Sequence, residues 1–571
     1  MRPGPVYSEQ AQCQDCYKCV RACPVKAIRV SSGHAVVMPE RCVACGACVA
    51  ACPSGAKRVR DDVPRVEALL RAGRQAVVSL APSYLSEFED LEPPRLIAAL
   101  KGLGFMGVSE TALGAQQVSA RLAQGLDAGT GRTWISTACP AAVDFVRTYL
   151  PGRIGNLTPL DSPLLAHARL LRERLGGDPA VVFIGPCIAK KQEAEAAPVL
   201  EAALTFEDLR AWLDRAGIDP ARLEPGPEDR FLLGPAAEGS FYPVEGGMAR
   251  ATALSMTGDH TRFVTLCGLE AIRRGLGDLP DPGAGNLFLE LLACEGGCVC
   301  GPKAARRSPV RARMRILDQA GPEPGGYPRL PELDLGRRFR PRIPAEPPVP
   351  EARLAEALRR LGKRGPGDEL NCGACGYDTC RDLAGAILGD RAEVRMCVSN
   401  LRNLAEKKAN ALLRTLPFGV VIVDEDLRII ESSEAFVRML GEEALLVHDS
   451  RPGLAGASLD KFLAFGDRFR AVLAGGDEIL RQNFAHGGRT LSTTIFAVEP
   501  GRVAGALLLD VTETETRQQE IIGKAEQVIQ NMLGNAQEIA FSLGRNAARS
   551  EGILNSIIAE FRGPDRSGHG A

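Results

Sequence analysis

Cysteine is the residue type whose spacing in this sequence points most directly to chemistry, because thiolates bind soft metal ions and iron–sulfur clusters. The chain has 18 cysteines. The run C-x-x-C-x-x-C-x-x-x-C-P occurs twice, starting at Cys13 and at Cys42. Three thiolates this close together can hold three irons of one cube. A disulfide framework is not expected, since the first residues contain no apolar export segment and a reducing cytosol keeps thiols free.

This run is the pattern of bacterial two-cluster ferredoxins, in which the fourth cysteine of each run serves the other cluster. Residues 1–57 are therefore expected to form a ferredoxin domain with two 4Fe–4S clusters, and a zinc ribbon is the alternative. Small residues such as Gly46 and Ala47 would let backbone amides approach the sulfurs. The expected ligands are Cys13, Cys16, Cys19 and Cys52 for the first cluster, and Cys23, Cys42, Cys45 and Cys48 for the second.

A second group of cysteines lies late in the chain, with a different spacing and no histidine nearby. Four thiolates fit either zinc or one 4Fe–4S cluster, and Gly373 and Gly376 would permit a tight turn around a cube. The group resembles the small Fe–S domain of corrinoid iron–sulfur proteins and ion-pumping electron-transfer subunits, which favours a third 4Fe–4S cluster over structural zinc. Its members are Cys372, Cys375, Cys380 and Cys397.

Four further cysteines lie in three loops, each directly after an apolar strand-like run. The runs are 133–135, 180–184 and 287–292, and a helical pattern follows each loop. This order predicts an α/β fold with ligands at the strand ends. The loop cysteines are Cys139, Cys187, Cys294 and Cys298.

These loops resemble the H-cluster signatures of FeFe-hydrogenases, T-S-C-C-P, M-P-C-x-x-K-x-x-E and E-x-M-A-C-x-G-G-C-x-x-G. The resemblance implies that the four loop cysteines hold a 4Fe–4S cube, that Cys298 bridges to a two-iron subsite with CO, CN and dithiolate ligands, and that Lys190 hydrogen-bonds a cyanide. Ser162-Pro163 and Gly246-Gly247-Met248 lie in further similar segments. With the ferredoxin run, the resemblance covers residues 1 to about 305.

The departures from that family concern the proton path. Ala138 stands where the family has a cysteine that passes protons, and a methyl group cannot carry one. The positions aligned with proton-relay glutamates are Gln116 and Gln117, and methionines beside the subsite correspond to Gly185 and Leu292. Slow turnover is therefore expected. Two alternatives stay open: a working enzyme in which water replaces the thiol, and an Fe–S assembly protein without the two-iron subsite.

Composition and length limit the other function classes. The chain has 571 residues, which predicts about four domains. Lys and Arg number 69 against 70 Asp and Glu, so the net charge of −1 gives no case for nucleic acid or an anionic membrane. No apolar run of 18 residues exists that could span a bilayer. A cytoplasmic location is expected.

The C-terminal third predicts a sensory module. Residues 319–350 are dense in proline and are expected to form an extended connector. Strand patterns at 417–424, 427–432, 490–499 and 503–511, with a helix around 433–440, resemble a PAS domain. No PAS cofactor is assigned, because a lone histidine in a polar loop, as His448 is here, is more often solvated than a haem ligand. A later helical stripe predicts a signalling helix, either dimeric or folded back on its own chain.

We therefore expect a multidomain α+β and α/β chain that acts as a sensory FeFe-hydrogenase. It would bind or oxidise H2 slowly and relay redox state to a ferredoxin-like carrier or to a separate kinase or phosphatase, with a homodimer through PAS and the last helix. The alternatives are a ferredoxin-linked catalytic hydrogenase and an Fe–S scaffold. The expected boundaries are 1–57 ferredoxin, 58–318 H-cluster domain, 319–350 linker, 351–405 four-cysteine domain, 406–515 PAS and 516–571 helix and tail.

Overall fold

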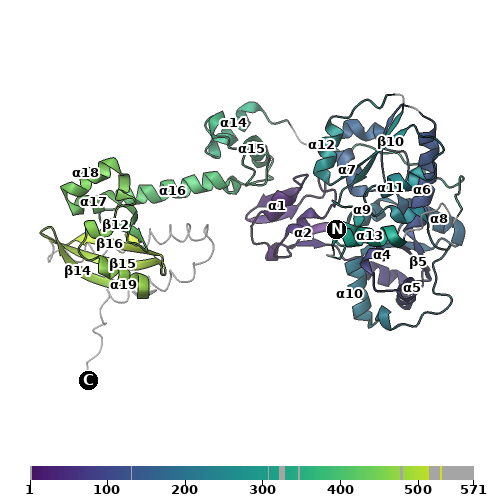
Figure 1. Cartoon of the computed structure of the whole chain (residues 1–571), viewed down its shortest axis with the longest axis horizontal. Coiled ribbons are helices and arrows are strands. Elements are labelled where there is room, and N and C mark those ends of the chain that lie inside the picture. Colours follow the sequence, from purple (N-terminus) through teal and green to yellow (C-terminus); the bar gives the residue numbers. More distant parts are fainter. Residues whose placement is uncertain are drawn as a thin grey trace, which may run out of the picture. The chain divides into compact units, whose positions relative to one another are not determined.

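In the computed structural model the chain forms two compact units, Met1–Cys397 and Val398–Ala571 (Figure 1). None of the described helices is long and apolar enough to cross a membrane. The predicted signalling helix lies outside the described residues, apart from two positions. The structure describes residues 3–129, 131–283, 285–305, 308–319, 328–344, 348–475, 480–512 and 528–529.

The ferredoxin module consists of two short antiparallel strand pairs and two one-turn helices. β1 pairs with β4 and β2 with β3, so the first and last strands bring the ends of the module together. Each helix follows a C-x-x-C-x-x turn and ends at the fourth cysteine of its run. The elements are β1 Val6–Ser8, α1 Lys18–Ala22, β2 Ile28–Ser31, β3 His34–Val37, α2 Ala47–Ala51 and β4 Lys57–Val59.

The first lobe of the next domain is a four-stranded parallel sheet in the order β6-β5-β8-β9. Its strands are buried along their whole length and mostly apolar, as expected of parallel strands covered by helices on both faces. The strands are β5 Ala76–Leu80, β6 Gly107–Glu110, β8 Ala180–Gly185 and β9 Ala202–Thr205. The helices are α3 Val63–Arg71, α4 Tyr84–Glu87, α5 Pro93–Gly102, α6 Thr111–Asp127, α8 Pro163–Leu175, α9 Ala189–Ala196 and α10 Phe206–Ala216.

The second lobe is a three-stranded parallel sheet in the order β10-β11-β7. The central strand β11 is buried at every residue. The strands are β7 Thr133–Ile135, β10 Thr261–Cys267 and β11 Asn286–Leu292. The helices are α7 Pro140–Tyr149, α11 Gly247–Ala253, α12 Leu269–Gly277 and α13 Pro309–Gln319. The α/β class predicted from the three loops is confirmed.

The proline-rich segment was expected to be an extended, semi-rigid connector, and the structure describes its residues 328–344. We call this part the strap. Leu330, Leu333 and Leu335 are buried in an apolar cluster that joins α6 and α8 to the second lobe, and Leu160 forms a β-bridge with Gly336. The strap is extended, as expected, but it is packed on the domain that precedes it.

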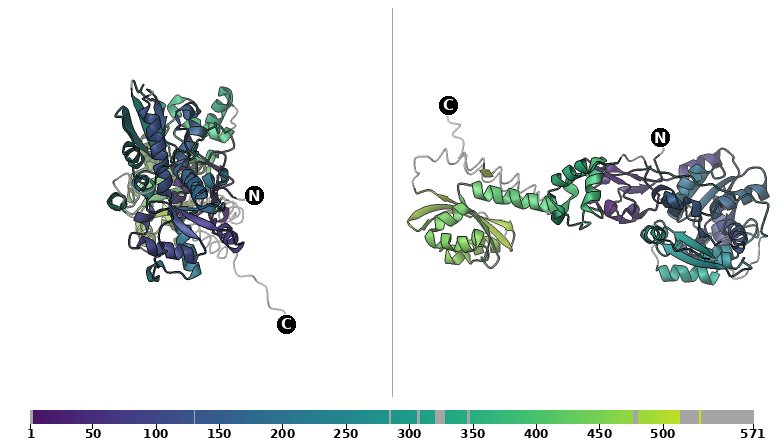
Figure 2. Two further views of the ribbon diagram at one scale, coloured as in Figure 1. Left: turned by 90° about the vertical axis from the view of Figure 1, so that its right-hand side faces the viewer. Right: turned by 90° about the horizontal axis from the view of Figure 1, so that it is seen from above.

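The four-cysteine domain is a small helical unit that contacts the ferredoxin module. Its helices are α14 Glu351–Arg360 and α15 Cys380–Leu388, and Figures 1 and 2 show them beside the ferredoxin strands. Thr379 caps α15 reciprocally with Asp382, which fixes the helix start at the third cysteine.

The second unit begins with α16, Val398–Thr415, and continues as a PAS-like domain. Its antiparallel sheet has the order β13-β12-β16-β15-β14, and helices cover the face that forms its core. The strands are β12 Gly419–Asp424, β13 Ile429–Ser432, β14 Leu480–His486, β15 Arg489–Glu499 and β16 Val503–Asp510. The helices are α17 Glu434–Leu440, α18 Glu442–Ser450 and α19 Gly466–Gly475.

Two features of this domain differ from the sequence prediction. His448 lies in helix α18 rather than in a polar loop, and its Nδ1 accepts a hydrogen bond from the Gly453 amide at 3.0 Å. The imidazole therefore ends a helix and has a structural partner. Strand β14 was not predicted.

Candidate iron–sulfur and H-cluster sites

The three cysteine loops meet in one pocket at the carboxyl ends of their strands. Cys139 follows β7 and caps α7, Cys187 lies between β8 and α9, and Cys294 and Cys298 follow β11. Since β8 belongs to the first sheet and β7 and β11 to the second, both lobes contribute ligands. The pocket is lined by Ala44, Cys45, Cys139, Ala141, Pro186, Cys187, Ile188, Ala189, Leu292, Ala293, Cys294, Cys298, Gly301 and Pro302.

The thiols of this pocket are buried close to one another, which favours the binding of positively charged irons between them. Burial raises the pKa of Cys187 to about 11, and the neighbouring thiolate of Cys139 contributes to that rise. Burial also raises the pKa of Cys294 well above its usual range, with the other three loop cysteines adding to the effect. Thiolates crowded in a buried space repel one another, and irons bound between them relieve that repulsion. The donor set therefore fits the predicted cube.

Lys190 lies beside these loops with two polar partners. Its Nζ donates to Glu193 Oε2 at 2.6 Å and to Ser162 Oγ at 3.2 Å, and both acceptors are buried. Ser162 also caps α8 by accepting from the Leu165 amide. The ammonium is thus held in place by groups from two different helices. Its predicted role toward a cyanide ligand stays a prediction.

The residues that differ from the FeFe-hydrogenase pattern lie in different surroundings. Ala138 packs against an apolar cluster that contains Leu113 and Phe288, and its side chain carries no proton donor. Leu292 lines the cysteine pocket, as its position predicts. At Gly185 a Cβ would lie 2.6 Å from Ala81 Cβ, so close packing favours glycine there.

Gln116 and Gln117 are buried, and their side-chain amides form hydrogen bonds to neighbouring segments. Gln116 donates to Glu238 at 3.2 Å and accepts from the Ala237 amide. Gln117 donates to the Pro328 carbonyl and accepts from the Leu330 amide, which ties the strap to α6. Neither is a lining residue of the cysteine pocket.

The ferredoxin cysteines lie close enough to influence one another, and their division between two clusters stays a prediction. Burial raises the pKa of Cys19, the positive charge of Lys57 lowers it, and the thiolates of Cys13, Cys16 and Cys52 add to the rise. The thiolates that chiefly raise the pKa of Cys48, after burial, are those of Cys23, Cys42 and Cys45. Backbone amides reach the sulfurs as well, since the Ala27 amide donates to Cys23 Sγ at 3.2 Å and the Ala44 amide to Cys42 Sγ at 3.3 Å.

The second ferredoxin cysteine set borders the loop-cysteine pocket directly. Cys45 and Ala44 line that pocket, and burial raises the pKa of Cys45 to about 12. Gly46 has φ +81, and a Cβ there would lie 2.5 Å from Pro302 Cγ. Only glycine lets the two modules approach this closely.

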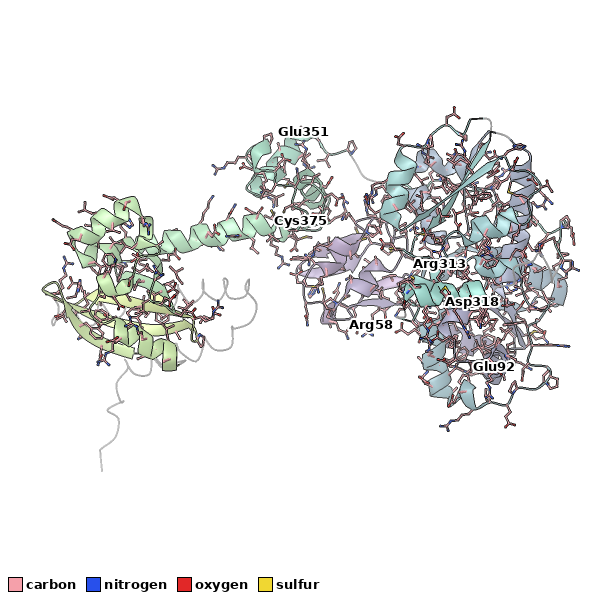
Figure 3. The ribbon with its side chains drawn as sticks, viewed as in Figure 1. Arg58, Glu92, Arg313, Asp318, Glu351 and Cys375 are labelled. Carbon is pink, nitrogen blue, oxygen red and sulfur yellow. The ribbon has the colours of Figure 1, made fainter. Side chains whose placement is uncertain are left out.

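The late cysteines also come together. The thiolates of Cys397 and Cys372 raise the pKa of Cys375, after the larger effect of burial (Figure 3). Cys380 begins α15, and its amide donates to the Asn371 side chain at 2.8 Å. Among the described residues, no three cysteine, histidine or acidic side chains converge on one metal ion. A cube does not require that, because each of its irons takes its own thiolate.

The four-cysteine domain is fixed to the ferredoxin module by several contacts. The Val30 amide donates to the Arg391 carbonyl at 2.9 Å, and the Ser32 amide donates to Glu393 Oε1 at 2.6 Å. Gly376 packs against α1, where a Cβ would lie 3.0 Å from the Arg21 nitrogen. The third cysteine group is therefore held beside the ferredoxin helix that separates Cys16 from Cys23.

Comparison with known families agrees with this arrangement. Residues 74–302 match the family described as iron-only hydrogenase large subunit, C-terminal domain; residues 5–53 match the 4Fe-4S dicluster domain, and residues 368–399 match an Fe-S cluster family. We call residues 74–302, which match the hydrogenase large-subunit model, the H-domain.

Individual relatives resemble parts of the chain. The periplasmic Fe hydrogenase large subunit of Nitratidesulfovibrio vulgaris is 29% identical over 360 residues, which are 52% of this chain and 85% of the relative. Iron hydrogenase 1 of Clostridium pasteurianum is 25% identical over 295 residues, 42% of this chain and 51% of the relative.

Solved structures give two further similarities. A variant of the FeFe-hydrogenase from Chlamydomonas reinhardtii is 17% identical with a TM-score of 0.36, covering 46% of this chain and 90% of that one. The PAS domain of an HTR-like protein from Haloarcula marismortui is 19% identical with a TM-score of 0.16, covering 20% of this chain and 96% of that one.

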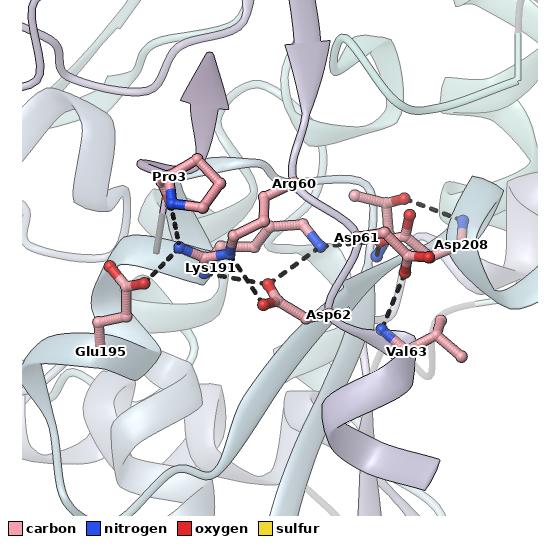
Figure 4. Close-up of polar contacts among 9 residues, drawn as sticks. Pro3, Arg60, Asp61, Asp62, Val63, Lys191, Glu195 and Asp208 are labelled. Carbon is pink, nitrogen blue, oxygen red and sulfur yellow. Dashed lines mark hydrogen bonds and ion pairs between the residues drawn. The ribbon is translucent and has the colours of Figure 1, made fainter. Parts of the chain in front are cut away.

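A buried ionic network joins the ferredoxin module to the H-domain (Figure 4). The Lys191 side chain is fully buried and pairs with Asp62 at 3.4 Å and with Asp208 at 2.8 Å. Arg60 makes two hydrogen bonds to Asp62 and also pairs with Glu195. Because Lys191 is adjacent to Lys190 on α9, this network holds the helix that carries Lys190 against the end of the ferredoxin module.

Several polar residues around the H-domain pocket were not predicted. Glu290 interrupts the apolar strand β11, accepts from the Met248 and Ala249 amides at 3.2 Å, and has a pKa raised to about 7 by burial. In the sequence, Glu290 could have been recognised as a single charged residue within an apolar strand. Asp144 and Arg342 are 198 positions apart in the numbering and form an ion pair at 3.6 Å, which no local pattern indicates.

Proposed function

We propose that this protein is a sensory FeFe-hydrogenase that binds and slowly oxidises H2 and passes its redox state to the PAS-like domain. The observation that carries the proposal is the combination of the retained cysteine ligands and Lys190 with Ala138 at the proton-carrying position. All four loop cysteines lie together with Lys190 beside them, while the position next to Cys139 carries a methyl group. The site keeps what binding needs and lacks a group that moves protons quickly.

The proposed H-cluster would be held by the four loop cysteines, with Lys190 at the cyanide side. When bound, it would supply the chemistry of H2 binding and cleavage. The protein's own contribution is positional: Glu193 and Ser162 fix the Lys190 ammonium, and Lys191 fixes α9. Cys45 in the pocket wall supports an exit for electrons toward the ferredoxin clusters.

The relay to the second unit is supported by sequence continuity. The four-cysteine domain is fixed to the ferredoxin module, and its last cysteine, Cys397, is followed directly by α16 and then by the PAS-like sheet. We propose a separate kinase or phosphatase as the output partner, a cytoplasmic location, and a homodimer through the PAS-like domain and the last helix.

A catalytic hydrogenase is the second candidate. It is favoured by the presence of all four ligands and Lys190 and by the names of the curated relatives, which are hydrogenases. In that case water would replace the missing thiol and the PAS-like domain would be a regulatory or docking module.

The decisive experiment restores the proton-carrying side chain. A thiol can give up and take back a proton, with an ordinary pKa of about 8.5, whereas a methyl group cannot, so Ala138→Cys is expected to raise H2 turnover on the order of a hundredfold, within the range of general acid–base catalysis. Ala138→Ser has a similar size but a hydroxyl that does not titrate, and it serves as the matched control. Infrared bands of iron-bound CO and CN on the matured protein verify equal loading.

Two outcomes contradict the proposal. If the parent already turns over rapidly and Ala138→Cys changes nothing, the protein is a catalytic hydrogenase. If the CO and CN bands are missing after complete maturation, both hydrogenase functions fail and the Fe–S scaffold is favoured.

A further inference from the structure

The strap forms a fixed connection across the junction of the H-domain and the ferredoxin module. The Asp161 amide donates to the Leu335 carbonyl at 2.8 Å, and the Arg337 amide donates to the Pro159 carbonyl at 3.1 Å. Further along, the Arg342 amide donates to the Arg147 carbonyl at 2.9 Å. The strap backbone is therefore held in register against the H-domain up to the ferredoxin edge.

Arg342 reaches from the strap to the loop that leads into the second ferredoxin cysteine set. Its Nη2 donates to the Pro39 carbonyl at 2.7 Å, three residues before Cys42. Its Nη1 pairs with Asp144 at 3.6 Å, and the two side chains are 29% and 14% exposed. This partial burial limits screening by water and salt.

Asp144 is itself held from two sides. It accepts from Arg147 Nη1 at 2.9 Å and from Gln192 Nε2 at 2.9 Å. Arg147 in turn donates to the Arg340 carbonyl at 2.8 Å. The ion pair is thus fixed by α7, α9 and the strap together, so both charges have defined positions.

Both charges lie beside the segment that enters the second ferredoxin cysteine set. The Arg342 guanidinium contacts the Pro39 carbonyl three residues before Cys42, and the Asp144 carboxylate lies against that guanidinium. A reduced cluster is more negative than an oxidised one, so fixed charges of opposite sign act on its reduction in opposite directions.

We propose that Arg342 raises the reduction potential of the second ferredoxin cluster, the one adjoining the H-domain pocket, and that Asp144 opposes it. Reduction adds one electron from an external donor and neither forms nor breaks a bond. The added negative charge is stabilised by a nearby fixed cation and destabilised by a nearby anion. Through Arg342 the strap would make reduction of the cluster beside the H-domain more favourable. The inference goes beyond the proposed sensing and does not depend on it.

The test is a redox titration of the purified full chain with its 4Fe–4S clusters, followed by electron paramagnetic resonance with dithionite as reductant. In Arg342→Gln, the equilibrium constant for reducing one of the clusters is expected to be three- to tenfold lower than in the parent protein. A tenfold change corresponds to 59 mV for a one-electron step. Arg340→Gln is the matched control, because it removes an exposed positive charge from the same strap and keeps the backbone carbonyl. It is expected to change that constant less than twofold.

Asp144→Asn removes a negative charge from the same ion pair, so its effect on the cluster should be opposite to that of Arg342→Gln. It therefore also tests whether a shift comes from structural damage. It is expected to raise the same equilibrium constant, whereas damage to the junction would move both variants alike. Arg342→Lys keeps the charge and should stay within twofold of the parent. Iron content is measured for each variant. Equal shifts in Arg342→Gln and Arg340→Gln, or shifts of the same sign in Arg342→Gln and Asp144→Asn, would overturn the proposal and leave the proposed function unaffected, since no H2 is used.

Discussion

Neighbouring residues of one loop serve different parts of the H-domain. Ala138 packs against the apolar cluster around Leu113 and Phe288, whereas Cys139 lines the cysteine pocket. A thiol at position 138 would therefore lie among apolar side chains, where burial raises its pKa. The gain in turnover expected for Ala138→Cys should accordingly grow toward higher pH, and it can be followed in the pH profile of that variant.

Glu110 offers a test of the buried electrostatics of the H-domain. Its carboxylate accepts from the Ala236 amide at 2.7 Å and from Tyr84 at 3.3 Å, and burial raises its pKa to about 7. A carboxyl with a raised pKa contributes stability that is present below its unfolded pKa of about 4.5 and is lost as pH rises through about 7. Glu110→Gln removes this loss.

The difference in the free energy of unfolding, Glu110→Gln minus parent, is expected to be about 2 kcal/mol larger at pH 8.5 than at pH 5. Urea unfolding followed by tryptophan fluorescence measures it, because both tryptophans of the chain, Trp134 and Trp212, belong to the H-domain. Glu173→Gln changes an exposed carboxyl on α8 and should show no such difference between the two pH values. A pH-independent effect of Glu110→Gln would contradict the raised pKa.

The sequence indicated which cysteines lie together, but it did not indicate the residues that support them. Cysteine sets such as Cys42 and Cys45 follow a local spacing that iron–sulfur chemistry requires. Supporting groups such as Asp144 and Arg342 follow no spacing, because tertiary packing alone brings them together. Glu193 is intermediate, since it is part of the lysine motif but its hydrogen bond to Lys190 is visible only in the structure.

At the scale of elements, the crossing of α6 and α8 depends on one glycine. A Cβ at Gly114 would lie 2.2 Å from the Pro163 carbonyl oxygen and 2.5 Å from the His167 nitrogen, both backbone atoms. Gly114→Ala must therefore push α6 away from α8, at a cost of about 1–3 kcal/mol. Because α8 begins at Ser162, which binds Lys190, the displacement would also reach the candidate site.

The matched control lies on the same helix. Gly125 has open space around its Cα, so Gly125→Ala should be neutral or stabilise by up to about 1 kcal/mol through helix propensity. The two variants are compared by urea unfolding with tryptophan fluorescence. Equal stabilities of Gly114→Ala and Gly125→Ala would show that the helices are not in close contact there.

Elements were predictable where a single periodicity dominates. The buried strand β8 is apolar throughout and was identified, as was β11, whose apolar run is interrupted only by Glu290 after its first residue, whereas β14 alternates weakly, with polar Arg481, Gln482 and Asn483, and was missed. The segment that contains the strap was expected to be an extended, semi-rigid connector because it is dense in proline, and its packing on the H-domain was not foreseen. Its three buried leucines, at steps of two and three, were too few to signal packing.

At the scale of the whole molecule, the chain order places the four-cysteine domain between the redox modules and the PAS-like domain. Its last cysteine, Cys397, ends the first unit, and α16 starts at the next residue. If the proposed relay operates, H2 should change hydrogen exchange at the amides of α16. Cys397→Ser removes one predicted ligand at the point where the two units join.

We expect Cys397→Ser to lower the iron content by up to four irons per chain, as the loss of one cube requires. The ferredoxin clusters should still be reduced under H2, but the difference in α16 exchange between H2 and N2 should disappear. Cys267→Ser removes a cysteine outside the three groups and is expected to keep both the iron and the exchange response. If α16 responds to H2 equally in Cys397→Ser and in the parent, the signal does not pass through the four-cysteine domain, and a route that bypasses this cluster must connect the H-domain to its output.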